Sequence, residues 1–471
     1  MDRKVNIGVV GALNLDFVTR SVEGDDAMEG IRSFNRDEER SVSDKDWWSF
    51  FYRYLPNRQH SLSPGGSAAN TGAAICAIHP QFNVHVVGTI GEDVEGQYLM
   101  DREHWYGAKV TPRVSKARSG KAFSYVERGA GRKIAVSPGC NDQFTVDYFD
   151  DLPSDLDWLH VSSFASEVAN IELAKFLKLA RNKYKNAKIS IDPGRFLTER
   201  SSQKIAIDAL RQCDFLFTKQ EELLSLAQTP DFGPESNARI AAVDHLFRLC
   251  GNDLSVVVER MLSGYSVYVK NSKPVHVEYS SLQSMGSADD IDDTGAGDVF
   301  NAGYIYGELR GFSVENRKGI IRSVIRKKLA QPGRMGFFEF ARATPIVFAS
   351  HSHKDKHELR RFIDQFEDTD VSFWEDVEDI RIGEEMIHAI EQGVRQSDFL
   401  AVFCSLDSAE SGWVAKEMEL ADQHNVRIIP IVLESSSLRM LPRIRELRYI
   451  NVPEIGFSKA KEQFLKEVWR R

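Results

Sequence analysis

Residues 292–309 have the sequence DDTGAGDVFNAGYIYGEL, in which two glycines and an aspartate stand directly before an apolar, helix-like pattern. Gly295 and Gly297 allow a tight turn with bare N–H groups, and the N-terminus of the helix that follows attracts an anion. Asp298 falls in the first helical turn, where a carboxylate can accept a proton from a hydroxyl that attacks phosphorus. The pattern predicts a phosphate-holding turn with a base beside it. The alternative is a tight strand-to-helix connection that Asp298 caps.

A second candidate lies far downstream, in the stretch SAESGWVAKEMELA. Trp413 and Glu417 are four residues apart, so in a helix they share one face. Taken alone, the pair is typical of a half-buried tryptophan that covers a surface glutamate. The surrounding sequence decides between that interpretation and a functional one.

The elements that must position these residues fall into two series. From Val5 to about Leu329, near-continuous apolar runs alternate with helical stretches, which predicts a parallel sheet covered on both faces. Within this series, the stretch KAFSYVERGAGRKIAVSPG has the pattern of a β-hairpin. Proline and glycine interrupt the pattern around residues 331–343, and a second α/β series follows. We therefore expect domains at residues 1–333 and 343–471, joined by a linker at 334–342.

Composition limits the classes of function. The chain has 471 residues, too many for one hydrophobic core, and a net charge of −9 without a long basic run. That charge favours neither nucleic acid nor an anionic membrane, so a small-molecule partner is expected. The five cysteines are far apart and form no CxxC pair. They are typical of reduced thiols in a cytoplasmic protein, and no segment has the pattern of a signal peptide or a membrane span.

The first series resembles the ribokinase or PfkB-like family of carbohydrate and nucleoside kinases. The resemblance depends on four motifs in the family's order: VVGALNLDF, GGSAANTGAA, VGTIGEDVEGQYL and DDTGAGD. It implies a ribokinase-like sandwich in which the hairpin forms a small β lid, with ATP and Mg²⁺ as cofactors. By this resemblance Asp298 is the base. The implied substrate residues are Asp16, Gly65, Gly66 and Asn70, and the implied anion hole is Gly295, Ala296 and Gly297.

Three positions depart from the family pattern. Lys219 replaces the asparagine of the Asn-x-x-Glu motif, whose glutamate remains as Glu222, and both stand near the implied ATP phosphates. A charged lysine cannot ligate a metal, although it can contact phosphate, so no metal ligand is assigned. Glu259 stands where the family places a threonine near the nucleotide and would bring negative charge towards ATP, and Asp293 replaces another threonine. A domain that binds its ligand without phosphorylating it competes with an active kinase.

The second series resembles Toll/interleukin receptor (TIR) domains. The resemblance depends on FASHSHKD, the spacing W-x-D-x-x-x-I-x-x-G from Trp374 to Gly383, SDFLAVFCS, and S-x-W-V-x-x-E from Ser411 to Glu417. It implies a flavodoxin-like, doubly wound fold with a parallel sheet. TIR domains are either adaptors or enzymes that cleave NAD⁺, and in the enzymes the residue that matches Glu417 is catalytic. The presence of Glu417 and Trp413 favours the enzyme.

The resemblance also implies the residues around NAD⁺. One carboxylate suffices, because nicotinamide leaves as a neutral base while the ribose develops oxocarbenium character. Arg381 and Gly383 fall in the loop that the family uses for assembly. His351 and Ser405 have ordinary alternatives, as a loop residue and the end of a strand. The expected NAD⁺-binding residues are Ser350, His351, Trp374, Ser405 and Trp413.

The combination predicts a sensor joined to an effector. The kinase-like domain would bind a sugar, nucleoside or nucleotide, and the TIR domain would hydrolyse NAD⁺ to nicotinamide and linear or cyclic ADP-ribose, as a homo-oligomer in bacterial antiviral defence. One rival is an active ATP-dependent sugar or nucleoside kinase with a non-catalytic TIR module. Another is an adaptor that uses both domains only for binding.

Overall fold

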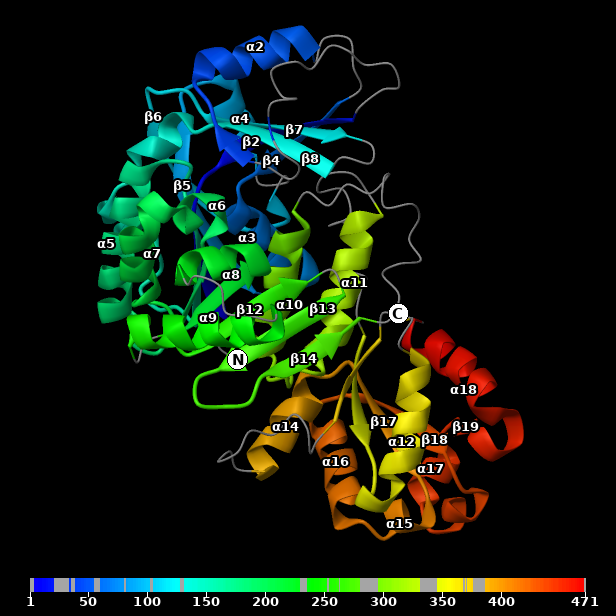
Figure 1. Cartoon of the computed structure of the whole chain (residues 1–471). Coiled ribbons are helices and arrows are strands. Elements are labelled where there is room, and N and C mark those ends of the chain that lie inside the picture. Colours follow the sequence, from blue (N-terminus) through cyan, green and yellow to red (C-terminus); the bar gives the residue numbers. More distant parts are fainter. Residues whose placement is uncertain are drawn as a thin grey trace. The chain divides into compact units, whose positions relative to one another are not determined.

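The computed structural model divides into two compact units (Figure 1). The first comprises residues 1–278, 283–302 and 325–341, and the second 279–282, 303–324 and 342–471. Helix α10 runs across the division at residue 302. The structure describes residues 4–20, 34, 39–54, 60–79, 82–101, 105–127, 131–228, 235–251, 254–261, 263–279, 295–330, 345–366, 369, 371–375 and 386–469. The predicted linker at 334–342 lies outside them.

A nine-stranded sheet forms the centre of the kinase-like part, in the order β14-β13-β12-β11-β10-β9-β1-β5-β6. Seven strands, from β12 to β6, are parallel, and β13 and β14 add an antiparallel edge. In sheet order the strands are β14 (Val275–Glu278), β13 (Gly264–Val269), β12 (Val256–Met261), β11 (Phe215–Lys219), β10 (Lys188–Asp192), β9 (Trp158–Ser162), β1 (Asn6–Val10), β5 (Asn83–Gly91) and β6 (Lys109–Ser115). Every residue of β9 is buried, as the apolar runs predict for a sheet covered on both faces.

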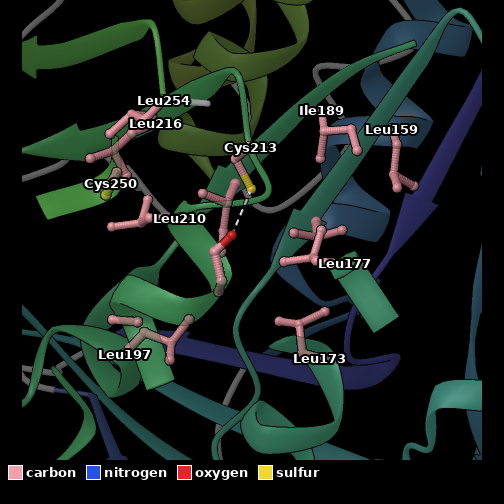
Figure 2. Close-up of a cluster of buried hydrophobic side chains, with 14 of the residues drawn as sticks. Leu159, Leu173, Leu177, Ile189, Leu197, Leu210, Cys213, Leu216, Cys250 and Leu254 are labelled. Carbon is pink, nitrogen blue, oxygen red and sulfur yellow. Dashed lines mark hydrogen bonds between the residues drawn. The ribbon is translucent and has the colours of Figure 1, made fainter. Parts of the chain in front are cut away.

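Helices cover both faces of this sheet. On one face lie α5 (Glu167–Lys183), α7 (Gln203–Leu210), α8 (Gln220–Ala227) and α9 (Glu235–Cys250), and on the other lies α3 (Ser67–Ile78). Helices α10 (Ala296–Leu309) and α11 (Arg317–Leu329) follow β14 in the chain. Figure 2 shows the core of the first face, where Leu173 and Leu177 of α5 lie near Leu159 and Ile189 of the sheet. There the Cys213 thiol donates to the backbone oxygen of Ala209 over 3.4 Å. All five cysteines are buried free thiols.

A second, five-stranded sheet forms the lid, in the order β3-β8-β7-β2-β4. The predicted hairpin is present as the antiparallel pair β7 and β8. Helix α2 (Asp44–Tyr54) packs on this sheet through Trp47, whose ring lies edge-on to Phe17 with centroids 5.1 Å apart. The strands are β3 (Glu39–Ser41), β8 (Gly131–Ser137), β7 (Gly120–Glu127), β2 (Asn14–Arg20) and β4 (His60–Gly65), and the short helices α4 (Val94–Met100) and α6 (Gly194–Thr198) complete this part.

The C-terminal part contains a five-stranded parallel sheet in the order β16-β15-β17-β18-β19. Its core packs Phe362 against Phe403 and Phe464. The strands are β15 (Ile346–Ser350), β16 (Ser372–Trp374), β17 (Phe399–Cys404), β18 (Arg427–Val432) and β19 (Ile450–Asn451). The helices are α12 (Lys356–Ile363), α14 (Met386–Gln396), α15 (Leu406–Ala409), α16 (Gly412–Gln423), α17 (Pro442–Glu446) and α18 (Val452–Val468). No helix within the described ranges has the length and apolar character needed to span a bilayer.

Candidate functional site

Asp298 lies in the first turn of α10, where side chains of α3 hold its carboxylate. The Ser67 hydroxyl donates to Oδ1 over 2.7 Å, and the Asn70 amide donates to Oδ2 over 3.0 Å. Burial raises the pKa of Asp298 to about 6, although the hydrogen bonds from Ser67 and Asn70 oppose this. A carboxylate whose pKa lies closer to neutrality is a better general base than an exposed aspartate. Asn70, predicted to bind substrate, therefore also positions the predicted base.

The predicted anion hole forms the start of the same helix. Gly295 has φ +80°, in the region that favours glycine, and its carbonyl accepts from the Val299 N–H over 3.0 Å as the helix begins. Ala296 and Gly297 follow as the first two residues of α10. The first N–H groups of a helix have no partner within it and carry partial positive charge. Gly295, Ala296 and Gly297 therefore lie at a helix N-terminus that can attract an anion, and their role in holding one stays a prediction. Asp293 lies outside the described residues.

A buried arginine, which the sequence reasoning missed, lies beside this turn. Nη1 of Arg260 donates to Asp192 Oδ2 over 2.7 Å and to Asn301 Oδ1 over 2.8 Å. Burial acts to raise the pKa of Asp192, but the charge and hydrogen bond of Arg260 outweigh it and hold that pKa below its usual value. Asn301 adds a hydrogen bond to Asp192 from α10 over 2.8 Å. The guanidinium thus joins the ends of β10 and β12 to the first turns of α10.

The sequence placed Glu259 near the phosphates of ATP, and in the structure it faces the other way. Neighbouring residues of a strand point to opposite faces of a sheet, and Arg260 is the one that faces α10. Glu259 is fully buried on the α9 side, where it accepts a hydrogen bond from Tyr268 Oη over 2.9 Å and lies 3.7 Å from Arg239. Burial raises its pKa. The charge that β12 contributes to the turn is therefore positive.

The residues that match the family's metal motif do not fit Mg²⁺. Glu222 Oε2 accepts from the Lys219 backbone N–H over 2.9 Å and lies 3.8 Å from Arg260 Nη2. Burial and the charge of Asp192 raise the pKa of Glu222, against the effects of Arg260 and Lys219. Mg²⁺ needs carboxylate oxygens that are not committed to cations. In the described ranges, no group of three or more His, Cys, Asp or Glu side chains is arranged to hold a metal.

A pocket between the lid and the main sheet is lined by one of the predicted substrate residues, Gly66, whereas Asp16, Gly65 and Asn70 are not among its lining residues, so their substrate-binding roles stay predictions. Asn14 and Ser67 also line the pocket, with Asp192 and Arg195. Gly66 has φ +103°, and a Cβ there would lie 1.8 Å from the Ala12 carbonyl oxygen. A Cβ on Gly65 would lie 2.0 Å from Oδ2 of Asp16, which stands on β2. Gly65 is therefore required by the close approach of the end of β4 to Asp16 on β2, and Gly66 by the approach of the backbone before α3 to Ala12.

In the C-terminal part, Glu417 of α16 lies beside the end of β15. Its side chain is 1% exposed, and Oε2 accepts a hydrogen bond from the Ser350 hydroxyl over 2.5 Å. Ser350 is the last residue of β15 and is itself buried. Trp413, one helical turn before Glu417, is 45% exposed, so it is not a cover for a surface glutamate. The structure brings together Ser350 and Glu417 and leaves Trp413 open to a ligand.

The remaining predicted residues of this part have other contacts. His351 is buried, with Nδ1 3.0 Å from the Ala349 carbonyl oxygen. Ser405 caps α15 and donates to Asp355 Oδ2 over 2.6 Å. Burial raises the pKa of Asp355, against the hydrogen bond from Ser405. The NAD⁺-binding roles of His351 and Ser405 stay predictions.

Trp374 is buried, and its ring stacks on Phe348 with centroids 4.7 Å apart. One face of the ring therefore already has a packing partner within the fold. The role of Trp374 in binding NAD⁺ stays a prediction. Arg381 and Gly383 lie outside the described residues, and so does the assembly loop predicted for them.

Comparisons with known proteins agree with a ribokinase-like fold followed by a flavodoxin-like one. The model of the pfkB family of carbohydrate kinases matches residues 52–317, and that of the TIR domain matches residues 347–466. The first match covers more than half of the chain. The chain therefore belongs to the pfkB carbohydrate kinase family and carries a C-terminal TIR domain, as its sequence predicted.

Relatives and solved structures cover the kinase-like part. An uncharacterized sugar kinase of Archaeoglobus fulgidus is 28% identical over 231 residues, 49% of this chain and 84% of that protein. The ATP-dependent ribose-1-phosphate kinase of Halopiger xanaduensis is 26% identical over 265 residues, which are 55% of this chain and 77% of that protein. Adenosine kinase from Sinorhizobium meliloti has a TM-score of 0.58 at 17% identity, covering 71% of this chain and 98% of its own. Arabidopsis thaliana ribokinase complexed with ribose and ATP has a TM-score of 0.51 at 17% identity, covering 72% and 99%. Both structures confirm the ribokinase-like fold.

Proposed function

We propose that the TIR domain hydrolyses NAD⁺ to nicotinamide and linear or cyclic ADP-ribose, with Glu417 as the catalytic residue. The observation that carries this proposal is the buried Glu417 carboxylate, which the Ser350 hydroxyl holds one helical turn from the exposed Trp413. Burial of a carboxylate costs free energy, which a function that needs the charge would explain. A domain that serves only as an adaptor has no use for a carboxylate placed in this way.

In the proposed reaction, the bond between C1′ of the ribose and N1 of nicotinamide breaks, and nicotinamide leaves as a neutral base with both electrons of that bond. The Glu417 carboxylate stabilises the positive charge that develops on the ribose. Water then attacks C1′ and releases a proton, which gives ADP-ribose; attack by a nitrogen of the adenine gives the cyclic product instead. Ser350 keeps the carboxylate oriented. Trp413, together with His351, Trp374 and Ser405, lines the proposed NAD⁺ site.

The kinase-like domain, in this proposal, binds a sugar, nucleoside or nucleotide and controls the TIR domain. Its pocket offers polar side chains from the lid, such as Asn14, from the main sheet, such as Asp192, and from α3, such as Ser67. Enzymes that deplete NAD⁺ must be kept inactive until a signal arrives, and a ligand-binding domain on the same chain supplies one. We infer a role in bacterial antiviral defence from this pairing of domains. We place the boundary at the linker 334–342.

We also propose that the active form is a homo-oligomer that assembles through both domains, with Arg381 and Gly383 in the contact between TIR domains. Light scattering of the full chain, with and without ligand, measures the assembly. A chain that cleaves NAD⁺ as a monomer contradicts this part of the proposal.

The test is release of nicotinamide from NAD⁺ by the purified full chain, alone and with candidate ligands such as ATP, ribose and adenosine. Substitution Glu417→Ala is expected to abolish release. If the variant retains full hydrolysis, the assignment of Glu417 is wrong.

One observation favours a second candidate, an ATP-dependent sugar or nucleoside kinase with a non-catalytic TIR module. Asp298 stands at the start of the anion-holding helix with a pKa of about 6, as a phosphoryl-transfer base requires. Consumption of ATP across sugars and nucleosides tests this candidate. Turnover that disappears in Asp298→Asn, with no loss of NAD⁺ under any condition, would replace the first proposal by the second.

A further inference from the structure

Arg260 is buried against the turn formed by Gly295, Ala296 and Gly297. Its side chain is 9% exposed. A Cβ built on Gly297 would lie 3.3 Å from Nη1 and 3.9 Å from Nε of Arg260, so the guanidinium lies against the bare backbone of the turn. Nη1 also lies 3.5 Å from the Gly297 carbonyl oxygen. A buried positive charge therefore stands directly beside the N-terminus of α10.

One N–H donor of the Arg260 guanidinium is unsatisfied within the described part of the chain. Nε of Arg260 is buried and has no hydrogen-bond partner among the residues that the structure describes. A buried N–H group without a partner costs free energy unless a ligand or water satisfies it. This donor lies at the same turn as the first N–H groups of α10, so both observations point to an anion at one place.

The nearby carboxylates are already committed. Asp192 Oδ2 accepts from Arg260 and Asn301, and its Oδ1 accepts from the Gly194 N–H over 3.2 Å. Glu222 accepts from the Lys219 N–H and lies near Arg260. A divalent cation would have to displace a buried guanidinium and would then stand close to two positive side chains, since Lys219 and Arg260 are register partners on β11 and β12. Asp192 and Glu222 would therefore have to give up their contacts with Arg260 and with the Lys219 N–H before either could ligate Mg²⁺.

We propose that this site binds the phosphate group of its ligand without a divalent cation, and that Arg260 supplies the positive charge that a metal would otherwise bring. The inference rests on the proposed role of the kinase-like domain as a ligand-binding unit, and it names the ligand class: a small molecule with a phosphate group. A nucleotide and a sugar phosphate share this chemistry. The phosphate oxygens accept from the first N–H groups of α10 and from Arg260.

Calorimetric titration of the full chain with ATP and, separately, with ribose 1-phosphate tests the proposal, each in excess EDTA and in excess MgCl₂. For the ligand that binds, the dissociation constant in EDTA is expected to be within about threefold of that in MgCl₂. The two titrations tell a nucleotide from a sugar phosphate. Binding that is about tenfold weaker or more in EDTA overturns the proposal, and so does the absence of binding by both ligands.

Substitution Arg260→Met keeps the length of the side chain and removes its charge. We expect affinity in EDTA to fall by at least about tenfold, and part of it to return in MgCl₂ because Asp192 and Glu222 are then released. Arg239→Met is the matched control, because Arg239 contacts Glu259 of the same strand from the opposite face of the sheet. It should bind as the wild type does. An Arg260→Met chain that binds as tightly as the wild type in EDTA overturns the proposal.

If Arg260→Met does not fold, as circular dichroism reports, Arg260→Lys retains a charge without the forked donors and is expected to bind with intermediate affinity. Wild-type affinity in that variant contradicts the role of the guanidinium. Cleavage of NAD⁺ is measured in a separate assay and enters none of these comparisons. The TIR proposal and the metal-free site can therefore fail independently.

Discussion

The two candidate sites contain buried carboxylates with different hydrogen-bond donors. In the kinase-like part, the guanidinium of Arg260 ties down Asp192, and it lies near Glu222. In the TIR part, a neutral hydroxyl holds Glu417. Both arrangements lie where parallel strands end and helices begin, a common place for ligand sites in α/β folds.

The difference lies in the charge that each contact leaves behind. The hydrogen bond from Ser350 orients Glu417 without bringing a positive charge of its own, which suits the proposed reaction, in which the substrate becomes positive. The pairing of Arg260 with Asp192 balances negative charge inside the protein, so the nearby helix N-terminus remains attractive to an anion. If both proposals hold, α/β folds of one class carry a site for a developing cation and a site for an anion in the same chain.

The contrast between the two sites depends most strongly on the negative charge of Glu417. Substitution Glu417→Gln keeps the shape and an acceptor for Ser350 and removes the charge, so the rate of nicotinamide release should fall by roughly 10²- to 10³-fold. Glu419→Gln is the control, because Glu419 is exposed on the same helix and pairs with Lys416. Equal rates in the two variants would contradict the role of the buried charge.

Arg260→Met tests the balance of charge at the other site. Removal of one partner from a buried ion pair leaves the other uncompensated, so the free energy of unfolding of the kinase-like domain should fall by about 3–5 kcal/mol at neutral pH. Urea titration followed by circular dichroism measures it. The loss should exceed that of Arg239→Met, because Arg239 lies 3.7 Å from its carboxylate and its side chain is 25% exposed. Similar losses would mean that Arg260 serves only as packing.

Asp298 should make stability fall as the pH rises. Its pKa is raised from the usual 3.8 to about 6, so between these values the folded state binds more protons than the unfolded state. Stability contributed by the bound proton is complete below the unfolded pKa and is lost through the folded pKa, by about 3 kcal/mol in all. Asp298→Asn cannot titrate. The difference in unfolding free energy between variant and wild type should therefore shift in favour of the variant from about pH 4 to about pH 7.5, and a constant difference would contradict the raised pKa.

Ser350→Ala tests whether the Ser350 hydroxyl positions Glu417. The carboxylate keeps its charge but loses one donor, which costs about 1.5–3 kcal/mol when the acceptor is charged. The kcat for NAD⁺ cleavage should fall about tenfold or more, with a smaller change in KM. A change confined to KM would instead place Ser350 among the residues that bind the substrate.

The smallest expected effect concerns the backbone of the anion-holding turn. Gly295→Ala forces an alanine to φ +80°, which costs about 1 kcal/mol of stability. Gly412→Ala is a control of opposite sign, because Gly412 begins α16 and a Cβ there meets nothing within 4 Å. Thermal unfolding of both variants measures the contrast. A Gly295→Ala chain that is as stable as Gly412→Ala would show that the turn has another conformation.

Much of the fold could be predicted from the sequence, because apolar runs, glycine turns and helix starts are local signals. The lid hairpin and the parallel sheet of the TIR domain follow from such patterns. The placement of Arg260 could not be predicted in this way. Glu259 and Arg260 are adjacent charged residues in a strand that is buried on both faces, so alternation alone leaves open which of them faces α10. The family resemblance pointed to Glu259, because the family places a threonine near the nucleotide at that position.

The pair Asp355 and Ser405 shows another limit of sequence reasoning. The two residues are fifty positions apart, and only the parallel pairing of β15 with β17 brings their side chains within hydrogen-bonding distance. The burial of Trp374 against Phe348 is likewise a tertiary fact. Residue type suggests what a side chain can do, but its neighbours decide which of those things remain available.

The side chain of Asn141 connects two segments near the base of the lid by hydrogen bonds. Its side chain accepts from the Leu13 N–H over 3.0 Å and donates to the Leu13 and Pro138 carbonyl oxygens and to Asn14 Oδ1. These bonds join the turn between β1 and β2 to the segment that follows β8. The Leu13 N–H can exchange with deuterated water only when its hydrogen bond to Asn141 breaks. The exchange rate of this amide therefore reports how often the two segments separate at the base of the lid.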